Sequence, residues 1–139
     1  MFGGYAKQMH KQVERIILSR APPEAAIPLM AELLTFMRAD AEDGRLNIVE
    51  FAKQAKRQKF SHQEAALALI DFVVTRMKEV AAQNSTSPGG EAIGHISAVL
   101  EHVIDAEYNE NGGRVVLRNG QIGRVMSSPR MSRFIKDGK

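Results

Sequence analysis

The feature that most constrains the fold is an apolar run from Ala65 to Val74, which only Asp71 interrupts. The run is too short to cross a bilayer, and it is apolar around most of a helix circumference. Ser61 and Glu64 precede it with the spacing of a capping box, in which each side chain bonds the backbone amide of the other residue. We therefore predict a core helix over residues 61–83 that other helices surround.

Composition narrows the class of protein. The 139 residues include no cysteine, which excludes disulfides, thiolate zinc sites and cysteine nucleophiles. Hydrophobic residues make up 44% of the chain and charged residues 25%, as in an ordinary soluble domain. Residues 1–9 lack the apolar segment of a secretory signal. We expect a soluble cytoplasmic protein with no membrane partner.

Charge is distributed unevenly along the chain. Residues 1–84 carry 12 basic and 10 acidic residues, whereas residues 85–113 carry five acidic residues and no lysine or arginine. Residues 114–139 then carry seven basic residues and one acidic residue. Such a switch indicates either a partner for the basic end or pairing between the two segments.

Apolar residues recur at steps of three and four outside the central run, which predicts further amphipathic helices. A helix over about residues 2–19 ends before two prolines. The next helix either begins near Glu24 and is kinked at Pro28, or begins only at about Ile27. It ends within Ala39–Gly44. Two more helices are predicted over residues 46–57 and 91–110.

The end of the chain changes character. Residues 85–90 are loop formers, and they predict a flexible linker after a four-helix bundle over residues 1–84. Asn119-Gly120 between two apolar segments predicts a β-hairpin, so residues 91–126 are expected to form a helix plus hairpin. Residues 127–139 are polar and basic, and we expect disorder there unless a partner binds. The predicted fold class is mainly α.

The stretch over residues 55–65 resembles a helix-turn-helix motif. Ala55, Phe60, Ser61 and Ala65 occupy the places of its small, apolar, serine and second small residues, while Lys59 stands where glycine is usual. The resemblance implies base-edge contacts by the first residues of the second helix and phosphate contacts by the basic face before it. The alternative is an ordinary helical corner with a solvated basic face. The implied nucleic-acid-binding residues are His62, Gln63, Lys53, Lys56, Arg57 and Lys59.

Residues 40–51 resemble an EF-hand loop, with Gly44 at the sixth position and Glu50 at the twelfth. Ala39 and Ala41 then occupy positions that must supply oxygen ligands, so two of the main ligands are missing. We predict no metal at this corner.

The same corner, followed by an amphipathic helix, is similar to tellurite-resistance TerB-like helical domains over about residues 26–80. The alternative is that Gly44 ends one helix and Asn47 caps the next, and this is the interpretation that we prefer.

Residues typical of catalysis or metal binding are sparse. His95 and His102 are seven residues apart, which separates them by about 10 Å along a helix, too far for one ion. Together with Glu91 and Asp105 they are better explained as a polar border. No nucleophile stands in a catalytic motif, and no glycine-rich phosphate loop follows a strand. We predict a non-enzyme without cofactor, metal or small-molecule substrate.

The basic end of the chain supplies the remaining candidate residues. A hairpin after a helix resembles the wing of a winged-helix domain, but the acidic segment before it would repel DNA. The alternative is that the acidic helix and the basic hairpin pair with each other, within one chain or across a dimer. The candidate phosphate contacts are Arg114, Arg118, Arg124, Arg130, Arg133, Lys136 and Lys139.

Two hypotheses follow from these patterns. The first is a small nucleic-acid-associated regulatory or accessory protein that binds through the basic helix face and the basic C-terminal segment. The second is a protein-interaction or assembly subunit that docks through the acidic helix and the basic tail, with a protein partner or a homo-oligomer expected. A phage- or plasmid-type regulator fits either hypothesis.

Overall fold

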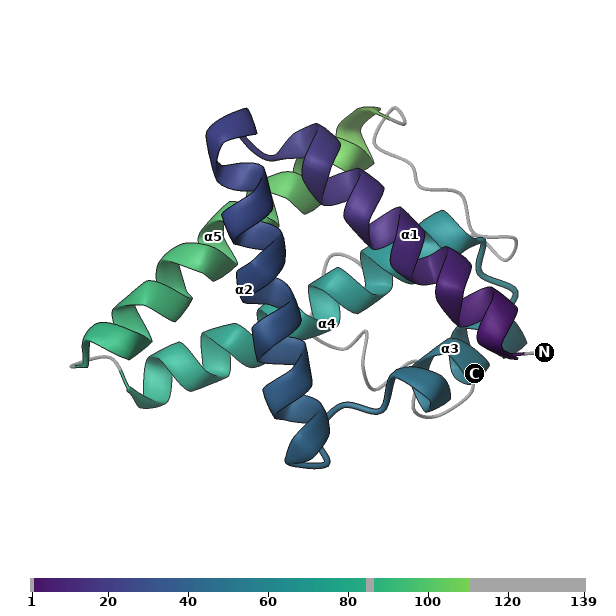
Figure 1. Cartoon of the computed structure of the whole chain (residues 1–139), viewed down its shortest axis with the longest axis horizontal. Coiled ribbons are helices and arrows are strands. Elements are labelled where there is room, and N and C mark those ends of the chain that lie inside the picture. The colour runs from purple at the N-terminus through teal and green to yellow at the C-terminus, as the bar shows by residue number, and fades with distance from the viewer. Residues whose placement is uncertain (1, 85–86, 111–139) are drawn as a thin grey trace.

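The computed structural model describes residues 2–84 and 87–110. These residues form five helices, and no strand lies among them. The prediction of a mainly helical chain is confirmed, whereas the predicted β-hairpin and the tail over residues 127–139 lie outside the described residues. The helices are α1 (Phe2–Arg20), α2 (Pro23–Glu42), α3 (Ile48–Arg57), α4 (His62–Gln83) and α5 (Pro88–Glu110) (Figure 1).

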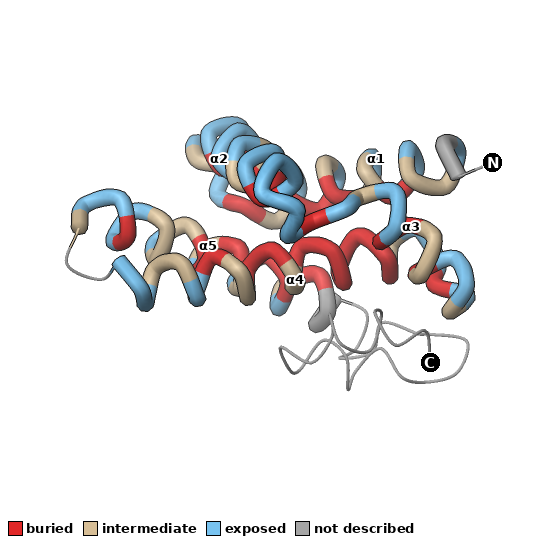
Figure 2. The backbone as a smooth tube through the Cα atoms, turned by 90° about the horizontal axis from the view of Figure 1, so that it is seen from below, coloured by how far each residue is buried: buried red, intermediate tan, exposed pale blue. Residues whose placement is uncertain are grey.

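The helices form two layers around one core. α4 and α5 run antiparallel and pack along each other, and α1 and α2 cross them on one side (Figures 1 and 2). The short helix α3 lies at the end of the molecule where α1 begins. None of the helices in the described ranges combines the length and apolar character that a bilayer span requires.

The prediction for the central helix is confirmed. Every side chain from Glu64 to Ile70 is buried, and so are those of Val73, Val74 and Met77. The capping box is formed: the Ser61 amide donates to Glu64 Oε1 at 2.6 Å, and the Glu64 amide donates to Ser61 Oγ at 3.1 Å. α1, α2, α3 and α5 all pack against α4, which explains why it is apolar around most of its circumference.

α5 begins at Pro88, three residues before the expected start. Proline suits a first helical position because the backbone N–H that it lacks would make no hydrogen bond within the helix there. Ser87 Oγ accepts from the Gly90 amide at 3.0 Å. A Cβ on Gly90 would lie 1.9 Å from the Asn84 carbonyl oxygen, so only glycine allows the chain to turn this tightly. Residues 88–90, predicted as part of the linker, are therefore helical.

The buried side chains of α5 belong to the same core as those of the other helices. Leu100, Val103 and Ile104 are all buried and join the cluster built around α4. Residues 1–84 and α5 therefore share one hydrophobic core across the connection that we predicted as a linker.

α2 runs through Pro28 and ends at Glu42, within the stretch Ala39–Gly44 where the sequence predicts its end. Pro28 lies near the helix start, where losing one backbone bond interrupts little of the helix. Asp40 is only 6% exposed, because Arg76 of α4 donates from Nε to Asp40 Oδ2 at 3.0 Å. This ion pair ties the end of α2 to α4.

Candidate nucleic-acid interface

The predicted corner between α3 and α4 closes with a Schellman motif. The Phe60 amide donates to the Ala55 carbonyl and the Lys59 amide to the Lys56 carbonyl, both at 3.0 Å. Lys59 has a φ of 66°, the left-handed conformation that glycine usually takes at this position. Phe60 is buried, and its carbonyl accepts from the Tyr5 hydroxyl at 2.9 Å. The corner is thus fixed against α1.

The corner between α2 and α3 has the same motif with glycine in place. The Arg45 amide donates to the Asp40 carbonyl at 2.8 Å, and Gly44 has a φ of 75°. Asn47 Oδ1 then accepts from the Glu50 amide at 2.9 Å, which confirms Asn47 as the cap of α3. Within residues 2–84 and 87–110, no group of three or more histidine, aspartate or glutamate side chains is placed to hold a metal ion.

The first residues of α4 have contacts within the protein. The His62 ring, exposed on one side, lies edge-on to Tyr5 with centroids 4.9 Å apart. Gln63 Nε2 donates to Glu107 Oε2 at 2.6 Å. The turns that follow, from Glu64 to Ile70, are buried. α4 therefore presents little surface to a nucleic-acid groove beyond His62, unlike the recognition helix that the motif implies.

The basic residues predicted on α3 lie at the molecular surface. Lys56, Arg57 and Lys59 are exposed, and Lys53 is half-buried. Lys53 and Arg57 are four residues apart and share one stripe of the helix, while Lys56 lies on the neighbouring stripe. Their positive charge lies at the C-terminal end of α3, where the helix dipole favours cations.

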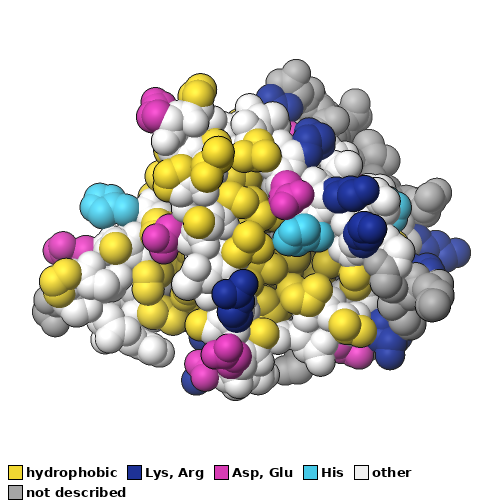
Figure 3. Space-filling model, viewed as in Figure 1, with side chains coloured by type: hydrophobic (Ala, Val, Ile, Leu, Met, Phe, Trp, Pro, Cys, Tyr) yellow, Lys and Arg dark blue, Asp and Glu magenta, His cyan; other side chains and the backbone are white. Residues whose placement is uncertain are grey.

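α1 adds two lysines that the sequence did not assign to this surface. Lys7 and Lys11 are exposed and one turn apart, and α1 packs against α3 with Tyr5 bonded to the corner. Dark-blue side chains gather over α1 and the α3 side of the molecule, at the right of Figure 3. We call the combined surface the basic edge: Lys7, Lys11, Lys53, Lys56, Arg57 and Lys59.

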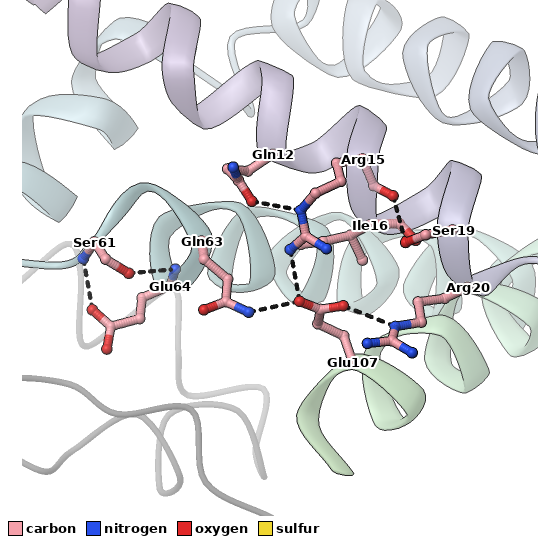
Figure 4. A network of polar contacts seen from close by, with 9 residues as sticks. All are labelled: Gln12, Arg15, Ile16, Ser19, Arg20, Ser61, Gln63, Glu64 and Glu107. Carbon is pink, nitrogen blue, oxygen red and sulfur yellow. Dashed lines mark hydrogen bonds and ion pairs between the residues drawn. The ribbon is translucent and has the colours of Figure 1, made fainter. Parts of the chain in front are cut away.

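Glu107 of α5 binds the two arginines of α1, Arg15 and Arg20 (Figure 4). Its carboxylate, only 2% exposed, accepts from Arg15 Nη2 at 2.7 Å and Arg20 Nε at 2.9 Å, in addition to Gln63. Burial alone would raise the pKa of Glu107, but these hydrogen bonds outweigh it and the pKa is lowered. The network joins α1, α4 and α5, and no short-range pattern in the sequence indicates it.

Asp71 lies at the contact between α4 and α5. A cavity of about 320 Å³ there is lined by Asp71, Glu101, His102 and Asp105. Burial, together with the charges of Glu101 and Asp105, raises the pKa of Asp71 to about 7, although Lys78 opposes the shift. Asp71 Oδ2 is buried and has no hydrogen-bond partner. Lys78 forms an ion pair with Glu101 across the same two helices.

The remaining candidates are placed as follows. His95 and His102 are both exposed on α5, in agreement with a polar border. Arg114, Arg118, Arg124, Arg130, Arg133, Lys136 and Lys139 lie outside the described residues, as does any pairing between α5 and the predicted hairpin.

Neither a family model, nor a curated protein, nor a solved structure matches this chain.

Proposed function

We propose that this protein is a small, non-catalytic nucleic-acid-associated regulatory or accessory protein that contacts phosphates through the basic edge. The observation that carries the proposal is the exposure of five cations on α1, on α3, which packs against it, and on the α3–α4 corner: Lys7, Lys11, Lys56, Arg57 and Lys59. The basic segment over residues 114–139 is proposed to extend these contacts.

The contacts that fit this surface are phosphate contacts. Lysine and arginine that neutralise phosphates release counterions, and this supplies affinity without reading sequence. Base reading in a duplex groove needs a helix that enters the groove. Because the turns that follow Gln63 are buried and Gln63 itself is bonded to Glu107, we assign His62 and Gln63 no base-reading role.

The salt dependence of binding tests the proposal. The affinity of the full chain for a labelled mixed-sequence oligonucleotide should fall steeply between 50 and 200 mM salt, as measured by fluorescence anisotropy. Lys56→Gln/Arg57→Gln should reduce the slope of log K against log salt by about 1.4–1.8, because each lost phosphate contact removes about 0.7–0.9.

A charge-matched control distinguishes binding by the basic edge from attraction by the net charge of the protein. Arg38→Gln/Lys78→Gln removes two positive charges from other parts of the surface, so the slope should stay near that of the wild type. Equal losses in both double variants would show attraction by overall charge, and salt-independent binding would overturn the proposal. The contribution of the C-terminal segment to the binding affinity is measured by neutralising four of its cations together: Arg130, Arg133, Lys136 and Lys139.

A second candidate function is a protein-interaction or assembly subunit. Ile27 at 74% exposure and Leu18 at 51% are large apolar side chains that the described helices leave in solvent. Light-scattering chromatography of the full chain, with and without an oligonucleotide, decides between the two. An oligomer that is indifferent to the oligonucleotide, and that Ile27→Ser dissociates, would favour assembly.

A further inference from the structure

A second surface on α3 has the composition of a ligand site. A cleft of about 500 Å³ lies where the α2–α3 corner, α3 and α4 meet, and its size lies within the range of roughly 300–1,000 Å³ typical of small organic ligands. Its apolar wall is the pair Phe51 and Phe72, whose rings lie edge to face with centroids 5.8 Å apart. Its polar lining includes Asn47, Gln54, Thr75 and Arg76.

Gln54 contributes an acceptor without a partner. Its Nε2 donates to Glu50 Oε2 at 3.0 Å, and since a carboxylate only accepts, this bond fixes which end of the amide is which. Gln54 Oε1 is left buried with no hydrogen-bond partner. A buried acceptor without a partner is costly, so a ligand N–H that reached this oxygen after a small side-chain rotation would be favoured.

Arg76 contributes a guanidinium that is already held in place. Asp40 accepts from its Nε at 3.0 Å and from its Nη2 at 3.3 Å, and Glu79 accepts from its Nη1 at 2.6 Å. These three bonds fix the plane of the guanidinium and leave one further N–H on each terminal nitrogen that can donate to a ligand. A fixed guanidinium plane stacks on flat aromatic ligands.

We propose that this cleft binds a nucleobase, so that the nucleic acid contacted by the basic edge is single-stranded or locally unpaired. A base combines a flat aromatic ring with N–H donors and ring acceptors, which match the Phe51–Phe72 wall, the Gln54 acceptor and the Arg76 donors. An unpaired base exposes these groups, whereas a base within a duplex does not.

α3 connects the cleft with the basic edge. The lining residues Glu50 and Gln54 are four residues apart, and each is followed three residues later by a cation, Lys53 or Arg57, so the lining residues and the cations occupy neighbouring positions on one helix. A strand whose phosphates contact Lys53 and Arg57 would thus carry its bases beside the cleft. The preference for single strands rests on the proposed phosphate contacts, but base binding by the cleft does not.

An abasic strand separates base from phosphate contacts. The full chain is titrated at fixed salt with a labelled single-stranded 12-mer and with an abasic 12-mer that has the same number of phosphates. The base-bearing strand should bind about 5- to 100-fold more tightly, the range that one stacked base supplies. Gln54→Met should lower this preference several-fold and leave abasic binding unchanged, while Gln58→Met, outside the cleft, should change neither.

Nuclear magnetic resonance on the wild-type chain tests the cleft without relying on any variant. Adenosine should shift the side-chain amide of Gln54 and the backbone amide of Thr75, whereas ribose 5-phosphate should not. Equal affinity for the two strands together with no shift by adenosine would overturn the inference and leave the phosphate contacts intact. If no strand binds but adenosine still shifts these signals, the proposed function fails and the nucleobase site stands.

Discussion

Charged residues at the contact of α5 with α1 and α4 are bonded to one another within the protein, whereas most charged side chains of the basic edge are exposed. Glu107 is 2% exposed and bonded to two arginines, and Asp71 is half-buried near other carboxylates. Lys56, Arg57 and Lys59 are exposed. Because desolvation makes buried charges strongly dependent on their partners, we expect the first region to govern stability and the exposed charges of the second to contribute little to it.

The largest expected effect is at Glu107. Glu107→Ala removes the shared acceptor of Arg15, Arg20 and Gln63, and it should lower the free energy of unfolding by roughly 3–5 kcal/mol, as for other broken buried ion pairs. Urea unfolding followed by circular dichroism measures this change. Glu91→Gln, an exposed acid on the same helix, should stay within about 0.5 kcal/mol of the wild type.

The Glu107 network also has an expected acid dependence. Its pKa is lowered in the folded protein, so its contribution is present above the unfolded pKa and is lost as the pH falls through the folded one. The difference in stability between the wild type and Glu107→Ala should therefore shrink below about pH 4. A constant difference across the acid range would contradict the charge interaction.

Asp71 is expected to change the stability with pH in the opposite direction to Glu107. Its pKa is about 7 in the folded protein, against the ordinary value of 3.8, so between these pH values the folded state binds more protons than the unfolded state. Stability should thus fall as the pH rises from about 4 to 7. Asp71→Asn, which keeps the neutral shape, should be more stable than the wild type at pH 8 by about 2–4 kcal/mol and nearly equal to it at pH 4.

The matched control for Asp71 is Asp105→Asn, an exposed carboxylate lining the same cavity. It should reduce the pH dependence without abolishing it, since the Asp105 charge is a smaller cause of the shift than burial. If the stability of Asp71→Asn changed with pH in the same way as that of the wild type, the Asp71 carboxyl would not titrate as described.

Lys59 is expected to affect both the stability of the fold and the binding of an oligonucleotide. Lys59→Gly should stabilise the protein by about 1 kcal/mol, because glycine adopts the observed positive φ without strain, while Gly44→Ala should destabilise it by about the same amount. If Lys59 serves binding, Lys59→Gly should also weaken oligonucleotide binding about two- to threefold. Urea unfolding and anisotropy on the same preparations test both effects.

The smallest expected effect on stability is at the edge itself. Lys7→Gln/Lys11→Gln should change the free energy of unfolding by less than about 0.5 kcal/mol, since both side chains are exposed. The salt slope of oligonucleotide binding should nevertheless fall by about 1.4–1.8. An unchanged slope, with Lys56→Gln/Arg57→Gln still effective, would remove α1 from the basic edge.

Local patterns predicted much of the fold. Ser61 with Glu64, Asn47 with Glu50, and Gly44 after α2 all act through hydrogen bonds within five residues, so their spacing is visible in the sequence. The start of α5 was predicted three residues late. Pro88-Gly89-Gly90 has loop composition, and only the close approach of Gly90 to Asn84 explains why it is helical.

The sequence by itself determined the helical class, the helix ends and a core helix, because periodicity and capping act between neighbours along the chain. Only the tertiary structure decided which charges are buried and which surfaces combine. Arg15 and Glu107 are 92 residues apart, the cleft draws on three segments, and Lys7 joins the basic edge because α1 packs on α3. Such contacts depend on how helices pack, which no local spacing specifies.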